Sequence, residues 1–101
     1  MKGRERAELR AEAHHLTVAL HIGRHGLTDA VVSSLDEVLR THELVKCQVA
    51  RDGALKAREA AQALAPRVEA EVVQVIGRTF TVYRRNPALH AKPDALPPWR
   101  R

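Results

Sequence analysis

A short loop with two glycines most constrains the fold of this chain, because the pattern of apolar residues changes across it. Residues 17–22 form an apolar run rich in β-branched side chains, which is typical of a buried strand. Residues 27–39 carry apolar side chains at the three-and-four spacing of one helix face. The intervening residues 23–26, Gly-Arg-His-Gly, are therefore predicted to form a strand-to-helix loop.

The chemistry of this loop suits a negatively charged ligand. Thr28 is a candidate N-cap of the helix, and Asp29 lies in the first turn, where a carboxylate complements the helix dipole. The glycines leave no Cβ to block a close approach, and the helix N-terminus beside Arg24 offers amides and a positive charge. Phosphate is the ligand that this arrangement predicts. The alternative is that Gly23 and Gly26 only satisfy the geometry of a tight turn.

Composition narrows the class of protein. The 101 residues, 45% of them hydrophobic, are enough for one small domain with a modest core. No apolar run is long enough to span a bilayer, and the charged N-terminus lacks a secretory signal. The single cysteine, Cys47, allows no intramolecular disulfide, which suits a reducing compartment. We therefore expect a soluble cytoplasmic protein that has no membrane partner.

The balance of charge indicates the kind of partner. A net charge of +5 and a pI near 10.1 favour polyanions such as nucleic acid. Aromatic residues make up only 3% of the chain, so successive bases have few rings on which to stack. If nucleic acid is bound, contacts with its backbone and shape should dominate.

The rest of the chain alternates between helices and strands. Helices are predicted over residues 4–14 and 54–64, and Pro66 is expected to end the later one. Strands are predicted over residues 43–50, 71–76 and 79–84. Gly77-Arg78 should join the last two strands in a tight hairpin. The order αβαβαββ predicts an α/β fold, a compact sandwich of three helices and a mixed four-stranded sheet in which the first two strands are parallel.

The predicted topology gathers basic residues. If the third strand also runs parallel to the first two, the carboxyl ends of all three strands meet at one edge, where open α/β sheets bind ligands. One basic surface could then be formed by Arg24, Arg51, Lys56, Arg58 and Arg78. The domain is predicted to cover residues 1–85, and the proline-containing residues 86–101 are predicted to be a flexible basic tail.

Catalytic and metal chemistry find no support in the sequence. The six histidines fit no closed zinc pattern, and only one cysteine accompanies them. Cys47 should point inward from its strand as a small buried hydrophobe and not act as a nucleophile. No serine, histidine and carboxylate occupy recognised motif positions. We expect a protein that is not an enzyme and that has no cofactor, no metal and no catalytic residue.

Several separated motifs resemble those of the CRM-domain family typified by the bacterial YhbY proteins. Residues 22–28, I-G-R-H-G-L-T, match the family's I-G-K-x-G-L-T loop, with Arg24 in place of the usual lysine. Residues 42–46, H-E-L-V-K, match H-E-L-I-K, and residues 74–79 followed by 82–84 match Q-V-I-G-K-T and L-Y-R. The resemblance covers nearly all of the chain up to Arg84.

The resemblance implies a small RNA-binding protein associated with assembly of the large ribosomal subunit. It also implies a fold similar to the C-terminal domain of translation initiation factor three, and a G-x-x-G loop that contacts RNA backbone as in KH domains. The partner would be large-subunit ribosomal RNA or pre-ribosomal particles, bound by a protein that we expect to be a monomer. The RNA-binding residues predicted from the loop, the basic residues and the resemblance are Gly23, Arg24, His25, Gly26, Thr28, Lys46, Arg51, Arg78 and Arg84.

Alternatives remain for single residues and for the whole chain. His25 can be an exposed turn residue that binds nothing, and Lys46 can simply cover an exposed sheet face. Glu43 is predicted to be structural. A basic protein-interaction module or a DNA-binding architectural module is the second functional class. An enzyme for nucleotides would need the P-loop lysine and serine, which are missing.

Overall fold

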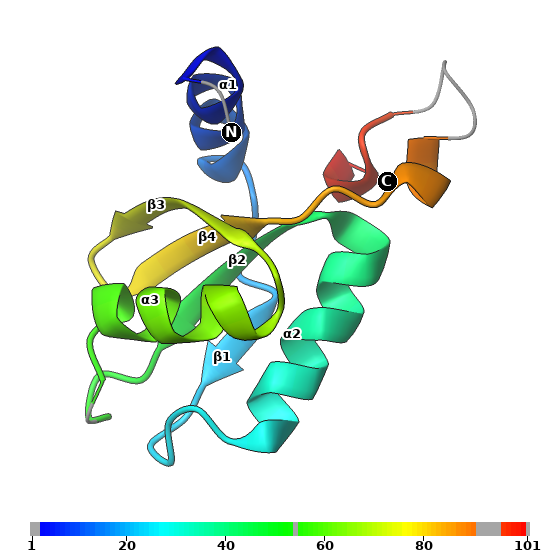
Figure 1. Cartoon of the computed structure of the whole chain (residues 1–101). Helices are drawn as coiled ribbons and strands as arrows, with labels where there is room; N and C mark the ends of the chain where they lie inside the picture. The colour runs from blue at the N-terminus through cyan, green and yellow to red at the C-terminus, as the bar shows by residue number, and fades with distance from the viewer. Residues whose placement is uncertain (1–2, 54, 91–95, 101) are drawn as a thin grey trace.

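The computed structural model describes residues 3–53, 55–90 and 96–100 (Figure 1). Within these ranges the helices are α1 (Gly3–Ala13), α2 (Asp29–His42) and α3 (Ala57–Arg67). The strands are β1 (Leu20–Ile22), β2 (Leu44–Val49), β3 (Glu71–Ile76) and β4 (Thr79–Tyr83). Two 3₁₀ turns follow, η1 (Pro87–His90) and η2 (Pro98–Arg100). The predicted α/β fold and its order of elements are confirmed.

The four strands form one mixed sheet in the order β1-β2-β4-β3. β1 pairs with β2 in parallel, while β4 lies between β2 and β3 and is antiparallel to both. β1, β2 and β3 therefore run in the same direction, which meets the condition for their carboxyl ends to share one edge, although β3 is hydrogen-bonded to β4 and not to β2. Gly77 takes a φ of 58° at the first turn position of the β3–β4 hairpin, where a type II′ turn requires a positive φ.

Both faces of the sheet carry apolar residues, but unequally. α2 and α3 cover one face, and the core between them and the sheet includes Leu35, Leu64 and Phe80, all fully buried. A smaller cluster on the other face joins Leu9 of α1 to Leu44, Val73, Leu16, Tyr83 and Trp99. Val73 has no partner in the pairing of β3 with β4, because a bulge lies between Val72 and Gln74. None of the helices among the described residues is long and apolar enough to cross a membrane.

The end of α3 differs from the prediction. We expected Pro66 to end the helix, but α3 continues through Pro66 to Arg67. Pro66 lies in the last turn, and the chain leaves the helix by a Schellman motif, in which Ala70 N–H donates to Ala65 O and Glu69 N–H donates to Pro66 O. Glu69 takes the left-handed conformation, with a φ of 55°. Proline is tolerated because the interruption affects only this terminal turn.

The first strand is shorter than predicted. Of residues 17–22, only Leu20–Ile22 belong to β1. β1 is an edge strand, so hydrogen bonds to β2 on one side are the backbone pairing that defines its length. Before β1 begins, the bond from Ala19 N–H to Lys46 O continues the contact with β2.

The described residues after β4 contact the domain at two places. The Glu43 carboxylate, fully buried at the end of α2, accepts a hydrogen bond from Asn86 N–H at 2.6 Å and contacts His90 Nε2 at 2.8 Å. Trp99 meets Tyr83 edge to face, with ring centroids 6.3 Å apart, and Arg100 is paired with Glu12. The domain boundary and the flexibility of the tail stay predictions, whereas the predicted structural role of Glu43 agrees with its buried contacts.

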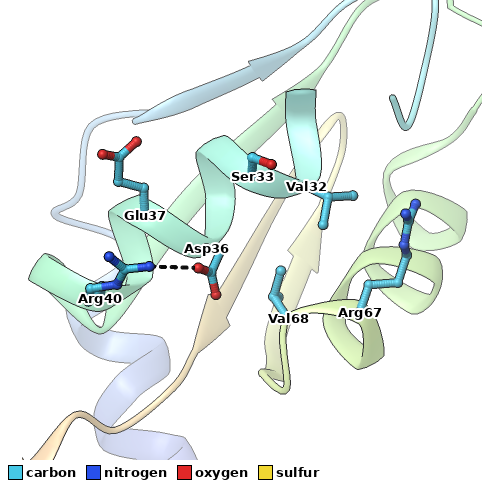
Figure 2. Close-up of a pocket in the computed structure, with 7 residues that line it drawn as sticks. All are labelled: Val32, Ser33, Asp36, Glu37, Arg40, Arg67 and Val68. Atoms are coloured by element: carbon cyan, nitrogen blue, oxygen red, sulfur yellow. Dashed lines mark hydrogen bonds and ion pairs between the residues drawn. The ribbon is translucent and has the colours of Figure 1, made fainter. Parts of the chain in front are cut away.

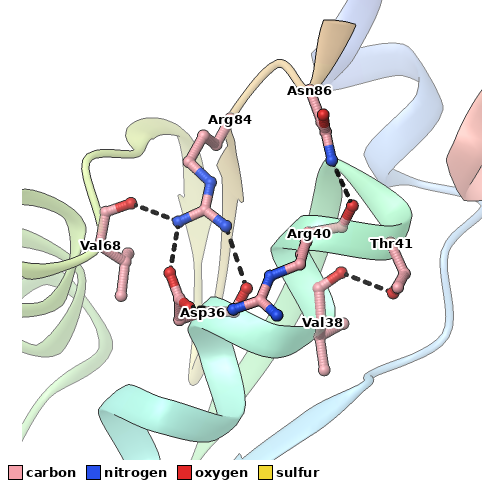
Figure 3. Close-up of polar contacts among 7 residues, drawn as sticks. All are labelled: Asp36, Val38, Arg40, Thr41, Val68, Arg84 and Asn86. Carbon is pink, nitrogen blue, oxygen red and sulfur yellow. Dashed lines mark hydrogen bonds and ion pairs between the residues drawn. The ribbon is translucent and has the colours of Figure 1, made fainter. Parts of the chain in front are cut away.

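Arg84 holds the two covering helices together at the end of β4 (Figure 3). Its Nη1 donates to Asp36 Oδ1 at 2.7 Å and to Val68 O at 2.8 Å, and its Nη2 donates to Asp36 O at 3.0 Å. The hydrogen bond from Arg84, with the nearby charge of Arg40, holds the pKa of the Asp36 carboxyl below its usual value. Arg84 therefore joins α2 to the residue that follows α3.

We predict that Arg84→Ala lowers the free energy of unfolding by about 2 kcal/mol, because two backbone carbonyls lose a charged donor. Urea unfolding followed by circular dichroism measures the change. Arg85→Ala is the matched control, since the neighbouring side chain is exposed, and its effect should stay within about 0.5 kcal/mol. Equal losses in the two variants would contradict the proposed linkage.

Candidate functional site

Three loops meet at the carboxyl ends of β1, β2 and β3, and we call this part of the molecule the loop end. It comprises residues 23–28 after β1, residues 50–53 and 55–56 after β2, and residues 77–78 of the hairpin. In Figure 1 the hairpin lies at the left and the other two loops at the lower left. Backbone hydrogen bonds fix the three loops side by side. Ala50 N–H donates to Ile22 O, and Val49 N–H donates to Arg78 O, each at 2.9 Å.

The glycine loop is a tight turn in which the two glycines differ. Gly26 N–H donates to Gly23 O at 3.1 Å, and Gly26 has a φ of 73°. A Cβ on Gly26 would lie 3.5 Å from Leu55 Cδ1, whereas a Cβ on Gly23 would meet nothing within 4 Å. Gly26 therefore meets a conformational need, and Gly23 leaves an open surface beside the loop.

The two helices that begin at the loop end have different N-termini. At α2, Thr28 is the N-cap as predicted, and its Oγ1 accepts a hydrogen bond from Val31 N–H at 3.2 Å. At α3 the N-cap is Lys56, which makes no side-chain hydrogen bond to the helix. The first amides of α3 thus have no side-chain acceptor from the N-cap, and helix N-termini of this kind attract anions.

Basic side chains surround these loops. Arg24, His25, Arg51, Lys56 and Arg78 are all exposed, and exposed Arg58 follows in the first turn of α3. Arg24 Nε lies 3.6 Å from Asp52 Oδ2, with both side chains largely exposed. An exposed pair of this kind is weak, so an anionic ligand can compete for Arg24. Asp52 is the residue that the sequence analysis missed, although its place directly after Arg51 was the available signal.

The predicted site residues divide into three groups. The loop end brings together Gly23, Arg24, His25, Gly26, Thr28, Arg51 and Arg78. Lys46 is half-buried and points to the sheet face opposite α2 and α3, where it lines a cavity of about 240 Å³ with Leu16 and Trp99. Arg84 follows β4 at the opposite end of the sheet, where its guanidinium group donates hydrogen bonds to Asp36 and to the carbonyl of Val68.

A cleft between α2 and α3 is less suited to a polyanion (Figure 2). Its volume is about 410 Å³, and its lining mixes Arg40 and Arg67 with Asp36 and Glu37. Arg40 already lies 3.1 Å from the Asp36 carboxylate. Because acidic and basic groups share the cleft, it offers no concentrated positive charge.

The described part of the chain shows neither a cluster of metal ligands nor an activated cysteine nucleophile. Among residues 3–53, 55–90 and 96–100, no three histidine, cysteine or acidic side chains are grouped to hold a metal ion. Cys47 is buried as predicted, and this burial raises the pKa of its thiol to about 12. The thiol is therefore protonated at neutral pH and is a poor nucleophile.

The fold and the loop end define a small α/β domain of a known family. The sequence model of the CRS1/YhbY (CRM) domain matches residues 1–84, and the chain belongs to this family.

Named relatives and a solved structure agree with this assignment. The chain is 30% identical over 86 residues to "Probable RNA-binding protein YqeI" of Bacillus subtilis, with 85% of this chain and 90% of that protein covered. It is 31% identical over 83 residues to "Probable RNA-binding protein PA4753" of Pseudomonas aeruginosa, with 82% and 80% covered. The solution structure of the hypothetical protein SAV1595 from Staphylococcus aureus superposes with a TM-score of 0.76 at 29% identity, covering 96% of this chain and 99% of that one.

We predict that the two loop glycines respond differently to alanine. Gly26→Ala should lower the free energy of unfolding by about 1 kcal/mol, because alanine is strained at a positive φ. Gly23→Ala should cause no loss, because its Cβ meets nothing. Urea unfolding of both variants measures the difference. An equal loss in both would show that their conformational roles do not differ.

Proposed function

We propose that this protein binds RNA through the loop end. The observation that carries the proposal is the junction of three loops with exposed Arg24, Arg51 and Arg78. The N-terminus of α3 lies beside them, and its N-cap residue makes no side-chain hydrogen bond to the helix. Backbone amides and arginine guanidinium groups are the donors that phosphate oxygens accept. The names of the two curated relatives support RNA as the nucleic acid.

The binding mode follows from the geometry of the glycine loop. Gly23 has open space beside it, so a phosphate can approach the backbone between Arg24 and the loops that follow β2 and β3. This contact resembles the clamp that a KH-type G-x-x-G loop makes on nucleic-acid backbone. Arg24 would exchange Asp52 for a phosphate when RNA binds.

We predict that a double variant, Arg24→Ala with Arg78→Ala, binds single-stranded RNA at least tenfold more weakly than the parent at low salt. Each lost phosphate contact should also reduce the slope of log affinity against log salt by roughly 0.7. Fluorescence anisotropy with a labelled oligonucleotide across a salt series measures both quantities.

The matched control for this variant is Arg4→Ala with Arg10→Ala. Both control arginines are exposed on α1, which contacts β2 and β3 away from the loop end. Equal losses in the two double variants would mean that general charge, and not the loop end, binds the RNA. Asp52→Asn supplies a test in the opposite direction, because removing the acidic partner of Arg24 should raise the affinity.

We further propose that the RNA is large-subunit ribosomal RNA or its precursor particle, in the cytoplasm. The resemblance of residues 22–28, 42–46 and 74–84 to the YhbY motifs supports this choice. In sucrose gradients of cell extract, the tagged parent protein should migrate with particles of large-subunit size. The Arg24→Ala, Arg78→Ala variant should stay at the top of the gradient, while the α1 control variant migrates like the parent. Migration of the parent at the top would contradict the ribosomal proposal alone.

A further inference from the structure

One side chain from each strand forms a continuous row beside the loop end. His21 of β1 is opposite Gln48 of β2, Gln48 is opposite Thr79 of β4, and Thr79 is opposite Ile76 of β3. Residues that are directly opposite one another point to the same face of a sheet. We call these four residues the rim row.

The rim row faces away from α2 and α3. On β1, β2 and β4 the next residue along the strand, such as Ile22 after His21 or Val49 after Gln48, belongs to the core under these helices. On β3 the residue before Ile76, Val75, packs against the same core. Successive side chains on a strand point to opposite faces, so the rim row points to the other side. On that side, the cluster of α1 and Trp99 packs on Leu44, Val73 and Tyr83 and does not include the rim row.

The exposure of the rim row is unusual in one respect. His21 is exposed, and Gln48 and Thr79 are half-buried, as expected of a solvated sheet face. Ile76, however, is 52% exposed, although a large apolar side chain gains little stability there. The row therefore combines an apolar surface with polar groups that can meet the edges of bases.

The rim row is continuous with the cations of the loop end. Gly23 lies two residues after His21, Arg51 lies three residues after Gln48, and Gly77-Arg78 directly join Ile76 to Thr79. Lys46 lies on the same face, opposite Thr81, in the next row along the sheet. A negatively charged strand held at the loop end can thus continue across the rim row without meeting an acidic side chain of the row.

We propose that the bases of single-stranded RNA lie on the rim row while the phosphates contact the loop end. This inference rests on the proposed function, and it identifies the bound form of the RNA as unpaired. A four-stranded sheet of this width contacts about two or three bases in other RNA-binding modules. Here Ile76 supplies apolar contact, and His21 and Gln48 supply hydrogen bonds, in place of stacking on aromatic rings.

The test compares a ten-nucleotide single-stranded RNA with an oligonucleotide of the same length in which abasic sites replace the bases. The parent should bind the intact RNA more tightly than the abasic one. Ile76→Ser should weaken binding of the intact RNA roughly fivefold, near the lower end of the effect of one stacked base. The same variant should bind the abasic RNA as the parent does, and its salt slope should not change, because no charge is removed.

Leu96→Ser is the matched control, since Leu96 is also a large exposed apolar residue, at 58%, and lies beside Trp99. Its affinity for both oligonucleotides should equal that of the parent. Photocrosslinking from 4-thiouridine gives an independent readout, with the expected crosslinks in the peptide that contains residues 74–80.

The outcomes separate this inference from the proposed function. If Arg24→Ala with Arg78→Ala lowers affinity while Ile76→Ser has no effect on the intact RNA and no crosslink reaches residues 74–80, the rim-row inference is wrong and the proposed function stands. If the parent binds neither oligonucleotide, both are wrong. Equal binding of intact and abasic RNA by the parent also overturns the role of the rim row.

Discussion

The backbone pairing of β2 on both of its edges is the constraint on which the loop end depends. β2 is parallel to β1 on one side and antiparallel to β4 on the other. At the carboxyl end of β2, the last backbone hydrogen bonds of these two pairings run from Ala50 N–H to Ile22 O and from Val49 N–H to Arg78 O. The charged side chains of the loops are exposed, and an exposed pair such as Arg24 with Asp52 is too weak to hold the loops in place. Because Val45, Cys47 and Val49 are buried in the core, β2 provides a rigid frame for the exposed cationic side chains.

The two ends of the sheet use arginine in different ways. At the end away from the loops, Arg84 is bound by Asp36 and by the carbonyl of Val68. This arginine has little freedom to contact a ligand, since its donors are already used within the fold. At the loop end, Arg24 pairs with the exposed Asp52 at 3.6 Å, and a ligand can replace that partner. The position of an arginine relative to backbone carbonyls and acids, and not the net charge, decides its availability.

Local patterns in the sequence were sufficient to predict the order of elements and the glycine loop. Apolar periodicity located β3 at residues 71–76, and the residue types around Thr28 located the start of α2. The partners of Arg84 could not be predicted in this way, because Asp36 is 48 residues away and no local pattern connects them. The extent of α3 was mispredicted for a related reason. The Schellman motif that accommodates Pro66 depends on Glu69 adopting a positive φ, a conformation that its residue type does not indicate.

The two glycines of the loop show why a motif alone does not define a site. In the string G-x-x-G the two positions look equivalent, but their backbones are not. Gly26 has a φ of 73°, and a Cβ there would lie 3.5 Å from Leu55 Cδ1. The turn therefore favours glycine at this position even in a loop that binds nothing. Gly23 has no positive φ, and a Cβ there would meet nothing within 4 Å, so the turn itself does not explain why a side chain is absent there. An approaching ligand backbone would explain it, since a phosphate beside Arg24 would occupy the space that a side chain at residue 23 would fill.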